Sequence, residues 1–333
     1  MVNSELKFLD RKCVLLTGGT GSFGQKFTEL VLKESKIKAL RIYSRDELKQ
    51  LQMSHRFPDP RLRFLIGDVR DKERLIRAMH GVDIVVHAAA LKQVPSAEYN
   101  PLEAVKTNIL GAANVIDASI DCKVKQSLFL GTDKSVHPVN LYGATKLVAE
   151  KLFVQANAYV GDGNTQLSCV RYGNVMGSRG SVIAIFLEQR RNGSIPITDE
   201  RMTRFWITLE QGVRFVIGCI GRMKGGEVFV PKIPSMRLVD VARTIAPKAR
   251  HHIVGIRPGE KLHEELITRE EWPRTQEFKT FYVIEPEHPF WKRANSHKGR
   301  RVAEGFEYRS DNNARWLTPQ ELTAHTHELG VTA

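Results

Sequence analysis

Short apolar runs alternate with amphipathic segments along the first half of the chain. The apolar runs predict buried strands because most of them end at polar or small residues, and they lie at 14–17, 40–43, 63–69, 82–90, 127–130 and 167–171. Between them, a helical spacing of apolar positions predicts helices at 22–34, 101–119 and 141–159. This alternation predicts an α/β fold with a doubly wound parallel sheet.

The pattern becomes less regular beyond about residue 175. It predicts a helix at 182–191, extended segments at 195–198, 202–207 and 226–230, and a turn followed by a helix at 257–264. We expect a dinucleotide-binding domain at 1–175, completed by segments from later in the chain, and a smaller mixed α/β lobe that binds substrate, mainly at 176–285. Residues 286–333 are expected to form a C-terminal tail.

Composition adds limits to this picture. The chain has 333 residues, enough for a large core, and its amino terminus lacks the apolar segment of a signal peptide, so we expect a cytoplasmic protein without a membrane span. Four cysteines are widely separated, which favours buried core residues over disulfides or a metal site. The net charge of +13 is dispersed and not interleaved with aromatics. A cleft for phosphate-rich ligands therefore explains part of the charge better than nucleic-acid binding does.

A glycine-rich turn links the first strand to the first helix. Gly18 permits a tight turn, Gly21 lets the backbone approach a pyrophosphate, and Gly24 allows close packing. The turn would aim the positive end of the helix at phosphates. The sequence therefore predicts a Rossmann-like nucleotide site that also uses Thr20, Ser22 and Phe23.

The second strand ends in a serine, an arginine and an aspartate. Ser44 and Arg45 suit a ribose 2′-phosphate, so we expect NADP, whereas Asp46 keeps NAD as the less favoured alternative. Asp68 and Val69, at the end of the third strand, are expected to meet the adenine. Further cofactor contacts are expected from Ala88, Tyr142, Lys146 and Val175.

The residues from 131 to 146 carry the candidate chemistry. Thr132, Asp133 and Lys134 follow a buried strand, and Tyr142 and Lys146 share one face of the next helix. A tyrosine with an ordinary pKa near ~10 is a poor base at neutral pH. We expect the Lys146 ammonium and a cationic nicotinamide to lower the pKa of Tyr142, which would then take a hydroxyl proton as hydride leaves the carbon.

The Asp133–Lys134 pair allows more than alcohol oxidation. Once a ketone forms at one sugar carbon, the neighbouring C–H becomes acidic. Lys134 could remove that proton while Asp133 protonates a departing hydroxyl, which is a β-elimination. This role needs a depressed pKa for Lys134, expected from burial and from Lys146. The alternative is an ion pair that only shapes the loop.

These motifs resemble those of the extended short-chain dehydrogenase/reductase superfamily, the nucleotide-sugar epimerases and dehydratases, over about residues 12–265. Thr-Asp-Lys at 132–134, Asn-Leu-Tyr-Gly-Ala-Thr-Lys at 140–146 and Arg-Tyr-Gly-Asn-Val-Met-Gly-Ser-Arg-Gly-Ser-Val at 171–182 look like the soluble inverting UDP-N-acetylglucosamine 4,6-dehydratases of pseudaminic acid biosynthesis. Hexose 4,6-dehydratases of other nucleotide types place Asp-Glu or Ser-Glu where this chain has Asp133-Lys134.

The resemblance implies a mechanism and partners. Tyr142 would oxidise C4 with NADP, Lys134 would take the C5 proton, and Asp133 would assist loss of the C6 hydroxyl. Hydride return to C6 would give UDP-2-acetamido-2,6-dideoxy-β-L-arabino-hex-4-ulose. A homo-oligomer, dimer or hexamer, is expected. The UDP-sugar would be held by Lys92, Asn174, Arg179, Thr198, Arg257 and Glu260.

Three alternatives stay open on the sequence. A UDP-N-acetylglucosamine 4-epimerase or a capsule-pathway dehydratase would share Thr-Asp-Lys. A non-catalytic NADP-binding regulator is a further possibility, but the intact Thr132, Tyr142 and Lys146 argue against it. Nucleic-acid binding rests only on the basic charge.

Overall fold

Parallel strands form the body of a central sheet. The structure is a computed structural model that describes residues 4–161, 163–178, 181–288, 290–291 and 297–328. Within this part of the chain, ten strands lie in one sheet in the order β16-β14-β15-β10-β6-β5-β4-β1-β2-β3. The run from β10 to β3 is parallel, and β15, β14 and β16 extend it in antiparallel register. The prediction of a doubly wound parallel sheet is confirmed.

The strands of this sheet are β1 Cys13–Thr17, β2 Ala39–Ser44, β3 Leu62–Ile66, β4 Ile84–His87, β5 Gln126–Leu130, β6 Gln166–Val170, β10 Val228–Pro231, β14 Thr275–Glu277, β15 Phe281–Ile284 and β16 Arg300–Arg301. The strands up to β10 lie in predicted extended segments, with small shifts at their ends, whereas β14, β15 and β16 were not predicted. The residues of β1 and β4 are buried throughout. Strands covered on both faces in this way read as unbroken apolar runs, which is why the sequence revealed them.

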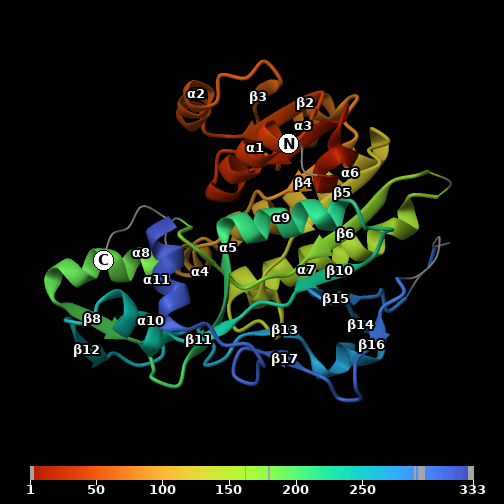
Figure 1. The fold of residues 1–333 in the computed structure, drawn as a ribbon. Coiled ribbons are helices and arrows are strands. Elements are labelled where there is room, and N and C mark those ends of the chain that lie inside the picture. Colours follow the sequence, from red (N-terminus) through yellow and green to blue (C-terminus); the bar gives the residue numbers. More distant parts are fainter. Residues whose placement is uncertain (1–3, 162, 179–180, 289, 292–296, 329–333) are drawn as a thin grey trace.

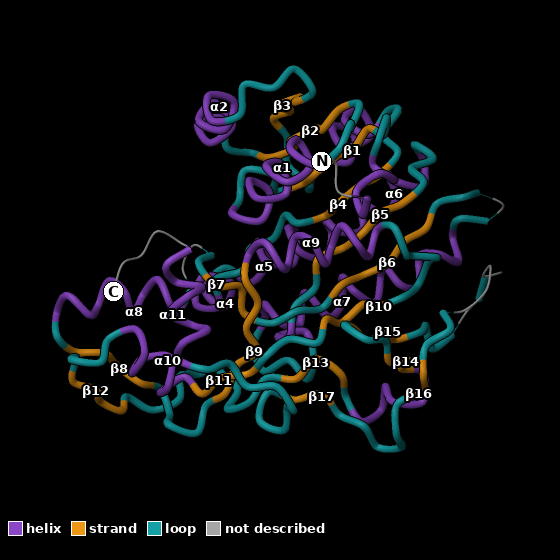
Figure 2. Tube along the Cα trace, viewed as in Figure 1, coloured by secondary structure: helices purple, strands orange, loops and turns teal. Residues whose placement is uncertain are grey.

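Helices cover both faces of the sheet (Figures 1 and 2). One layer contains α3, α6 and α7, which contact one another in that order, while α1 and α9 pack together elsewhere. The helices of this body are α1 Ser22–Glu34, α2 Glu47–Arg56, α3 Lys72–Met79, α4 Val94–Tyr99, α5 Pro101–Val105, α6 Gly111–Asp121, α7 Leu141–Gln155 and α9 Leu209–Ile220. A π-helical turn at Lys106–Leu110 joins α5 to α6, so the helix predicted at 101–119 is confirmed with one widened turn.

A second hydrophobic core lies in the lobe at the lower left of Figure 1. Its members include Met176, Trp206, Leu238 and Leu322, so the end of the chain returns to pack here. The remaining elements are β7 Asn174–Met176, α8 Val182–Gln189, β8 Ser194–Ile197, β9 Thr203–Thr208, β11 Ser235–Arg237, α10 Leu238–Ile245, β12 Arg250–Ile253, β13 Glu265–Ile267, β17 Tyr308–Arg309 and α11 Pro319–Glu328.

The prediction of a helix in the second half of the 257–264 segment is wrong. The turn there leads through irregular backbone into β13, which pairs with β17. Beside these strands, the Glu264 amide donates to Ser310 Oγ and the Ser310 amide donates to the Glu264 carbonyl. Pairing with a segment so distant in the chain gives no local signal in the sequence.

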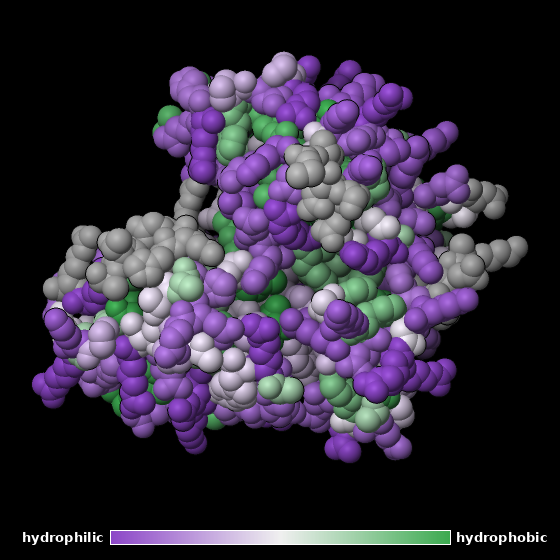
Figure 3. Space-filling view, in the orientation of Figure 1, coloured by the Kyte–Doolittle hydropathy of each residue, from purple (hydrophilic) through white to green (hydrophobic). Residues whose placement is uncertain are grey.

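The face in Figure 3 is mainly hydrophilic. None of the helices in the described residues is long and apolar enough to cross a membrane. The cysteines at 13, 169 and 219 are buried, Cys122 is half-buried, and all are free thiols.

A buried arginine ties three parts of the fold together. Arg171 follows β6, and its guanidinium donates to both carboxylate oxygens of Glu150 on α7, at 2.7 and 2.6 Å. It also donates to both oxygens of Glu271, at 2.9 and 2.8 Å, in the short helix Arg269–Arg274. All three side chains are buried. The arginine therefore fixes α7 and a returning segment against the sheet.

We expect Arg171→Leu to lower the free energy of unfolding by about 3–5 kcal/mol, because two buried carboxylates would lose their cation. Urea denaturation followed by circular dichroism measures this loss. Lys72→Met is the control, since Lys72 pairs with Asp117 at an exposed site and its removal should cost less than about 1 kcal/mol. Equal effects of the two substitutions would contradict the anchoring role of Arg171.

Candidate active site

A cleft of about 930 Å³ opens at the carboxyl ends of the parallel strands. In a doubly wound sheet this edge is where ligands bind, because the loops after the strands converge there. The cleft runs from the glycine-rich turn after β1 to the loops of the lobe. Residues predicted to bind the cofactor and residues predicted to bind the substrate therefore line the same cavity.

The glycine-rich turn has the shape that phosphate binding needs. Gly18 has a φ of +66°, and a Cβ there would lie 2.9 Å from the Ala89 backbone. A Cβ on Gly24 would lie 2.1 Å from the carbonyl oxygen of Gly19, so a larger residue would push α1 away from the turn. The first turn of α1 carries no acidic residue, which leaves its positive end open to anions. The cleft is lined here by Gly18, Thr20, Gly21, Ser22 and Phe23.

Polar residues surround the end of the cleft next to β2. Ser44, Arg45 and Asp46 line it, together with Asp68 and Val69. The Asp46 carboxylate caps α2 by accepting from the Lys49 amide at 2.9 Å, and it also pairs with the Lys49 ammonium. The Arg45 guanidinium lies 3.5 Å from Asp68 and is half exposed. The Asp46 carboxylate thus caps α2 and pairs with Lys49, while the Arg45 guanidinium lies at the cleft.

The loop after β5 carries three residues in close contact. Thr132 donates to Asp133 Oδ1 at 3.0 Å, and Lys134 Nζ donates to the same oxygen at 3.1 Å and to Asn174 Oδ1 at 3.2 Å. Thr132 and Lys134 line the cleft, whereas Asp133 is fully buried and is absent from the described cleft lining. The sequence did not predict that Asp133 would be buried while Thr132 and Lys134 on either side of it line the cleft.

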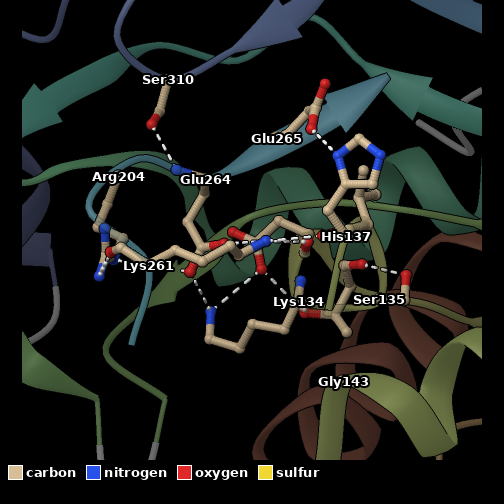
Figure 4. Close-up of polar contacts among 12 residues, drawn as sticks. Lys134, Ser135, His137, Gly143, Arg204, Lys261, Glu264, Glu265 and Ser310 are labelled. Atoms are coloured by element: carbon tan, nitrogen blue, oxygen red, sulfur yellow. Dashed lines mark hydrogen bonds and ion pairs between the residues drawn. The ribbon is translucent and has the colours of Figure 1, made fainter. Parts of the chain in front are cut away.

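A second carboxylate, from the segment before β13, meets Lys134 (Figure 4). Glu264 Oε1 lies 3.5 Å from Lys134 Nζ, and its other oxygen lies 2.9 Å from Lys261 Nζ. Arg204 Nε is 3.8 Å from Glu264 Oε1. Sequence reasoning did not select Arg204, Lys261 or Glu264, because they come from strand and loop segments far from the catalytic loop.

Electrostatics separates the two carboxyl groups beside Lys134. Burial raises the pKa of Asp133, although Lys134 opposes that shift. For Glu264 burial also acts to raise the pKa, but Lys134, Arg204 and Lys261 outweigh it and lower the pKa to about 2. Asp133 is therefore the carboxyl that holds a proton more readily, and Glu264 is ionised at neutral pH.

The expected depression of the Lys134 pKa is wrong for this structure. Burial does act to lower that pKa, but the attraction of Asp133 and Glu264 is larger, and the pKa is raised above its usual value. The sequence argument considered Lys146 and did not include Glu264. Lys134 is therefore an ammonium that contacts two acidic side chains.

Tyr142 and Lys146 lie on the buried face of α7, as their spacing predicted. Burial raises the pKa of Tyr142 to about 12, with opposing effects from Lys134 and from a hydrogen bond with Thr132. Burial lowers the pKa of Lys146 to about 7, and its Nζ lies 3.9 Å from the centre of the Phe129 ring. The cation that acts on the tyrosine here is thus Lys134, and the expected effect of Lys146 is not seen.

The structure brings the predicted substrate residues to the same cleft. Asn174 also orients Lys134, and the Glu260 carboxylate accepts from the Arg257 amide at 3.4 Å. Arg179 lies outside the described residues. The predicted residues that line the lobe side are Lys92, Asn174, Thr198, Arg257 and Glu260, and Ala88, Val175 and Lys146 line the cofactor side.

The parallel sheet, the glycine-rich turn and the Thr132, Tyr142 and Lys146 arrangement define a dinucleotide-binding fold of the short-chain dehydrogenase/reductase type. A family model described as "Polysaccharide biosynthesis protein" matches residues 14–286, and the chain belongs to this family.

Relatives with names and structures support this assignment. A Campylobacter jejuni protein named "UDP-N-acetylglucosamine 4,6-dehydratase (inverting)" is 52% identical, with 94% of this chain and 96% of that relative covered. A Rickettsia conorii protein named "UDP-glucose 4-epimerase" is 42% identical, with 83% of each chain covered. The X-ray structure of Pen from Bacillus thuringiensis is 38% identical and superposes with a TM-score of 0.89, over 97% of this chain and 99% of that one.

Gly143, next to Tyr142, permits the close approach of α7 to the catalytic loop. A Cβ at this position would lie 2.1 Å from the carbonyl oxygen of Lys134. We expect Gly143→Ala to lower the free energy of unfolding by about 1–3 kcal/mol through overpacking, although alanine stabilises an unconstrained helix by about 1 kcal/mol relative to glycine.

Urea denaturation tests this expectation. The matched control is Val148→Ala on the exposed side of the same helix, which should change stability by about 0.5 kcal/mol or less. A Gly143→Ala protein as stable as the parent would show that the loop can move away from the helix.

Proposed function

We propose that this protein is a UDP-N-acetylglucosamine 4,6-dehydratase that inverts C5. The observation that carries the proposal is that Thr132, Lys134 and Tyr142 line one cleft, with the buried Asp133 hydrogen-bonded to Thr132 and Lys134. The near full-length relative of that name supports the substrate and the reaction.

The cofactor site fits a dinucleotide. A Cβ on Gly18 or Gly24 would close the glycine-rich turn, and the amino terminus of α1 that follows carries no acidic residue. Both features suit a pyrophosphate. We propose NADP as the cofactor, because Asp46 is committed to capping α2 while Arg45 stands at the cleft. When bound, the nicotinamide would supply the chemistry of accepting a hydride from C4 and returning it to C6.

The first chemical step falls to Tyr142. Its phenol lies beside Thr132, which can hydrogen-bond the same C4 oxygen. The pKa near 12 in the ligand-free site is too high for a neutral-pH base, so the positive charge of an oxidised nicotinamide and the Lys134 ammonium together have to stabilise the phenolate. Removal of the C4 hydroxyl proton by Tyr142 then accompanies oxidation at C4.

The elimination falls to the Asp133–Lys134 pair. We assign removal of the C5 proton to Lys134 because its amine reaches the cleft, once the ammonium has passed a proton to the Asp133 carboxylate 3.1 Å away. The Asp133 proton assists loss of the C6 hydroxyl as water, and it can reach the cleft through Thr132 or Lys134, which contact the carboxyl at 3.0 and 3.1 Å. Return of the hydride to C6 together with a proton on the opposite face of C5 would give the inverted 4-keto-6-deoxy sugar.

The domain roles and assembly follow from this proposal. Residues 1–175 would hold the cofactor, 176–285 would mainly hold the UDP-sugar, and a homo-oligomer, dimer or hexamer, is expected. The product would enter pseudaminic acid biosynthesis. An epimerase, as in the Rickettsia relatives, is the second candidate. The higher identity to the relative named as a dehydratase, 52% against 42%, favours dehydration.

Incubation with UDP-N-acetylglucosamine in heavy water tests the proposal. We expect a 4-keto-6-deoxy product of L-arabino configuration with deuterium at C5, identified by NMR. UDP-N-acetylgalactosamine without dehydration would support the epimerase, and binding without turnover would support the regulator.

Lys134→Ala separates the two halves of the reaction. We expect dehydration to slow by about 10²–10⁴-fold. Reduced cofactor should still form because C4 oxidation uses Tyr142, but more slowly than in the parent, because the Tyr142 phenolate loses the stabilising charge of Lys134. Absorbance of the reduced nicotinamide and NMR of the product measure the two steps. Lys151→Ala, at an exposed position of α7, is the control. Elimination at the parental rate in Lys134→Ala would remove Lys134 from the base role.

Arg45→Ala tests the cofactor proposal. We expect the dissociation constant for NADP to rise by about 10–100-fold through loss of a charge-assisted phosphate contact, with NAD affinity changed less than about threefold. Isothermal titration calorimetry compares both cofactors on both proteins. Tighter binding of NAD than of NADP by the unmodified protein would overturn the proposal.

A further inference from the structure

Glu264 is a buried carboxylate beside the catalytic loop. Its side chain is 3% exposed, and its Oε1 lies 3.5 Å from Lys134 Nζ. Lys134 thereby contacts two carboxyl groups, Asp133 at 3.1 Å and Glu264 at 3.5 Å (Figure 4 labels Lys134 and Glu264). One of these groups belongs to the catalytic loop, and the other is brought in by the segment before β13.

The fold holds Glu264 firmly in this place. Its backbone amide donates to Ser310 Oγ at 2.9 Å, and its carbonyl accepts from the Ser310 amide at 2.8 Å. The Ser310 hydroxyl also contacts Thr203 Oγ1 at 2.6 Å, next to Arg204 on β9. The carboxylate is therefore positioned by β9 and the C-terminal segment as well as by its own turn.

The charged groups that face Glu264 are mainly cations. Lys261 and Arg204 lie 2.9 and 3.8 Å away, in addition to Lys134. The neighbouring titratable groups are directed to other partners: His263 contacts Thr203 and faces Asp311, and Glu265 pairs with His137. Glu264 is thus the acidic group on this side that acts directly on Lys134.

We propose that Glu264 is a positioning residue for the elimination step, which fixes the Lys134 amine at the cleft wall and leaves the buried Asp133 carboxyl to carry the proton. This inference rests on the proposed dehydratase function. Two observations carry it: Glu264 shares the Lys134 ammonium with Asp133, and Asp133 Oδ2 is buried without a hydrogen-bond partner among the described residues.

The Asp133 and Glu264 carboxyl groups share one ammonium, that of Lys134. Glu264 has three cations around it and stays ionised, so it supplies the negative charge that balances Lys134. Asp133 has no exposure to water, and a nearby negative charge disfavours its ionisation. Environments that push the pKa values of two acids apart commonly assign one as the proton carrier.

The sign of the pH effect follows from the charge. Elimination needs a protonated Asp133 and a neutral Lys134. The negative charge of Glu264 raises the pKa of both groups. The amine of Lys134 is the stronger base of the two, so this active protonation state is the less populated one, and the rate falls below the pKa of Asp133 and above the pKa of Lys134. Removing the Glu264 charge lowers both pKa values, so the acidic limb set by Asp133 and the alkaline limb set by Lys134 both move to lower pH.

Glu264→Gln in the full-length protein with NADP tests the inference. We expect dehydration to slow by about 10²-fold and both limbs of the pH profile to move down by roughly one unit or more, while reduced cofactor still forms. Glu265→Gln, the neighbouring carboxylate that pairs with His137, is the matched control and should leave both limbs in place. An unshifted profile in Glu264→Gln would overturn the inference.

Two further results keep the test decisive. If Glu264→Gln does not fold, Glu264→Asp is the second variant, because it keeps the charge on a shorter side chain. We expect it to shift both limbs of the pH profile in the same direction by a smaller amount. Unshifted limbs in Glu264→Asp would also overturn the inference. An unmodified protein that makes no 4-keto product would refute the proposed function itself. A dehydrating parent with an unshifted Glu264→Gln profile would refute only the role of Glu264.

Discussion

The buried ion pairs of Arg171 set the geometry on which the site depends. Arg171 holds Glu150 of α7 and Glu271, which lies one hundred residues further along the chain than Arg171. Tyr142 lies two helical turns before Glu150 on the same helix, so the anchor that fixes the helix also fixes the phenol above the sheet. A buried arginine with two carboxylates is costly to desolvate, and its value here is the single arrangement that it enforces.

Local patterns were sufficient for the fold and for half of the site. Buried strands read as apolar runs, and the Gly18 turn and the four-residue spacing of Tyr142 and Lys146 have mechanisms that need only neighbouring residues. The elements of the lobe were harder, because β13 forms by pairing with β17, from the tail. A helical assignment at 257–264 failed for that reason.

The electrostatics of the site could not be predicted from one segment. The sequence argument placed Lys146 beside Tyr142 and Lys134 and expected it to lower both pKa values. In the structure Lys146 is buried against Phe129, and the dominant charges on Lys134 come from Asp133 and Glu264. A pKa depends on every charge within a few ångströms, and Glu264 reaches Lys134 from 130 residues away in the chain.

The two halves of the proposed reaction therefore draw on different parts of the fold. Tyr142 and Lys146 belong to α7 and are held by the sheet and by Arg171. Lys134 is bonded to Asp133 on its own loop and to Glu264, whose position depends on Ser310 near the end of the chain. Oxidation uses Tyr142 of the first set with the charge of Lys134 beside it, whereas elimination also needs the Asp133 proton and the placement of the Lys134 amine by Glu264.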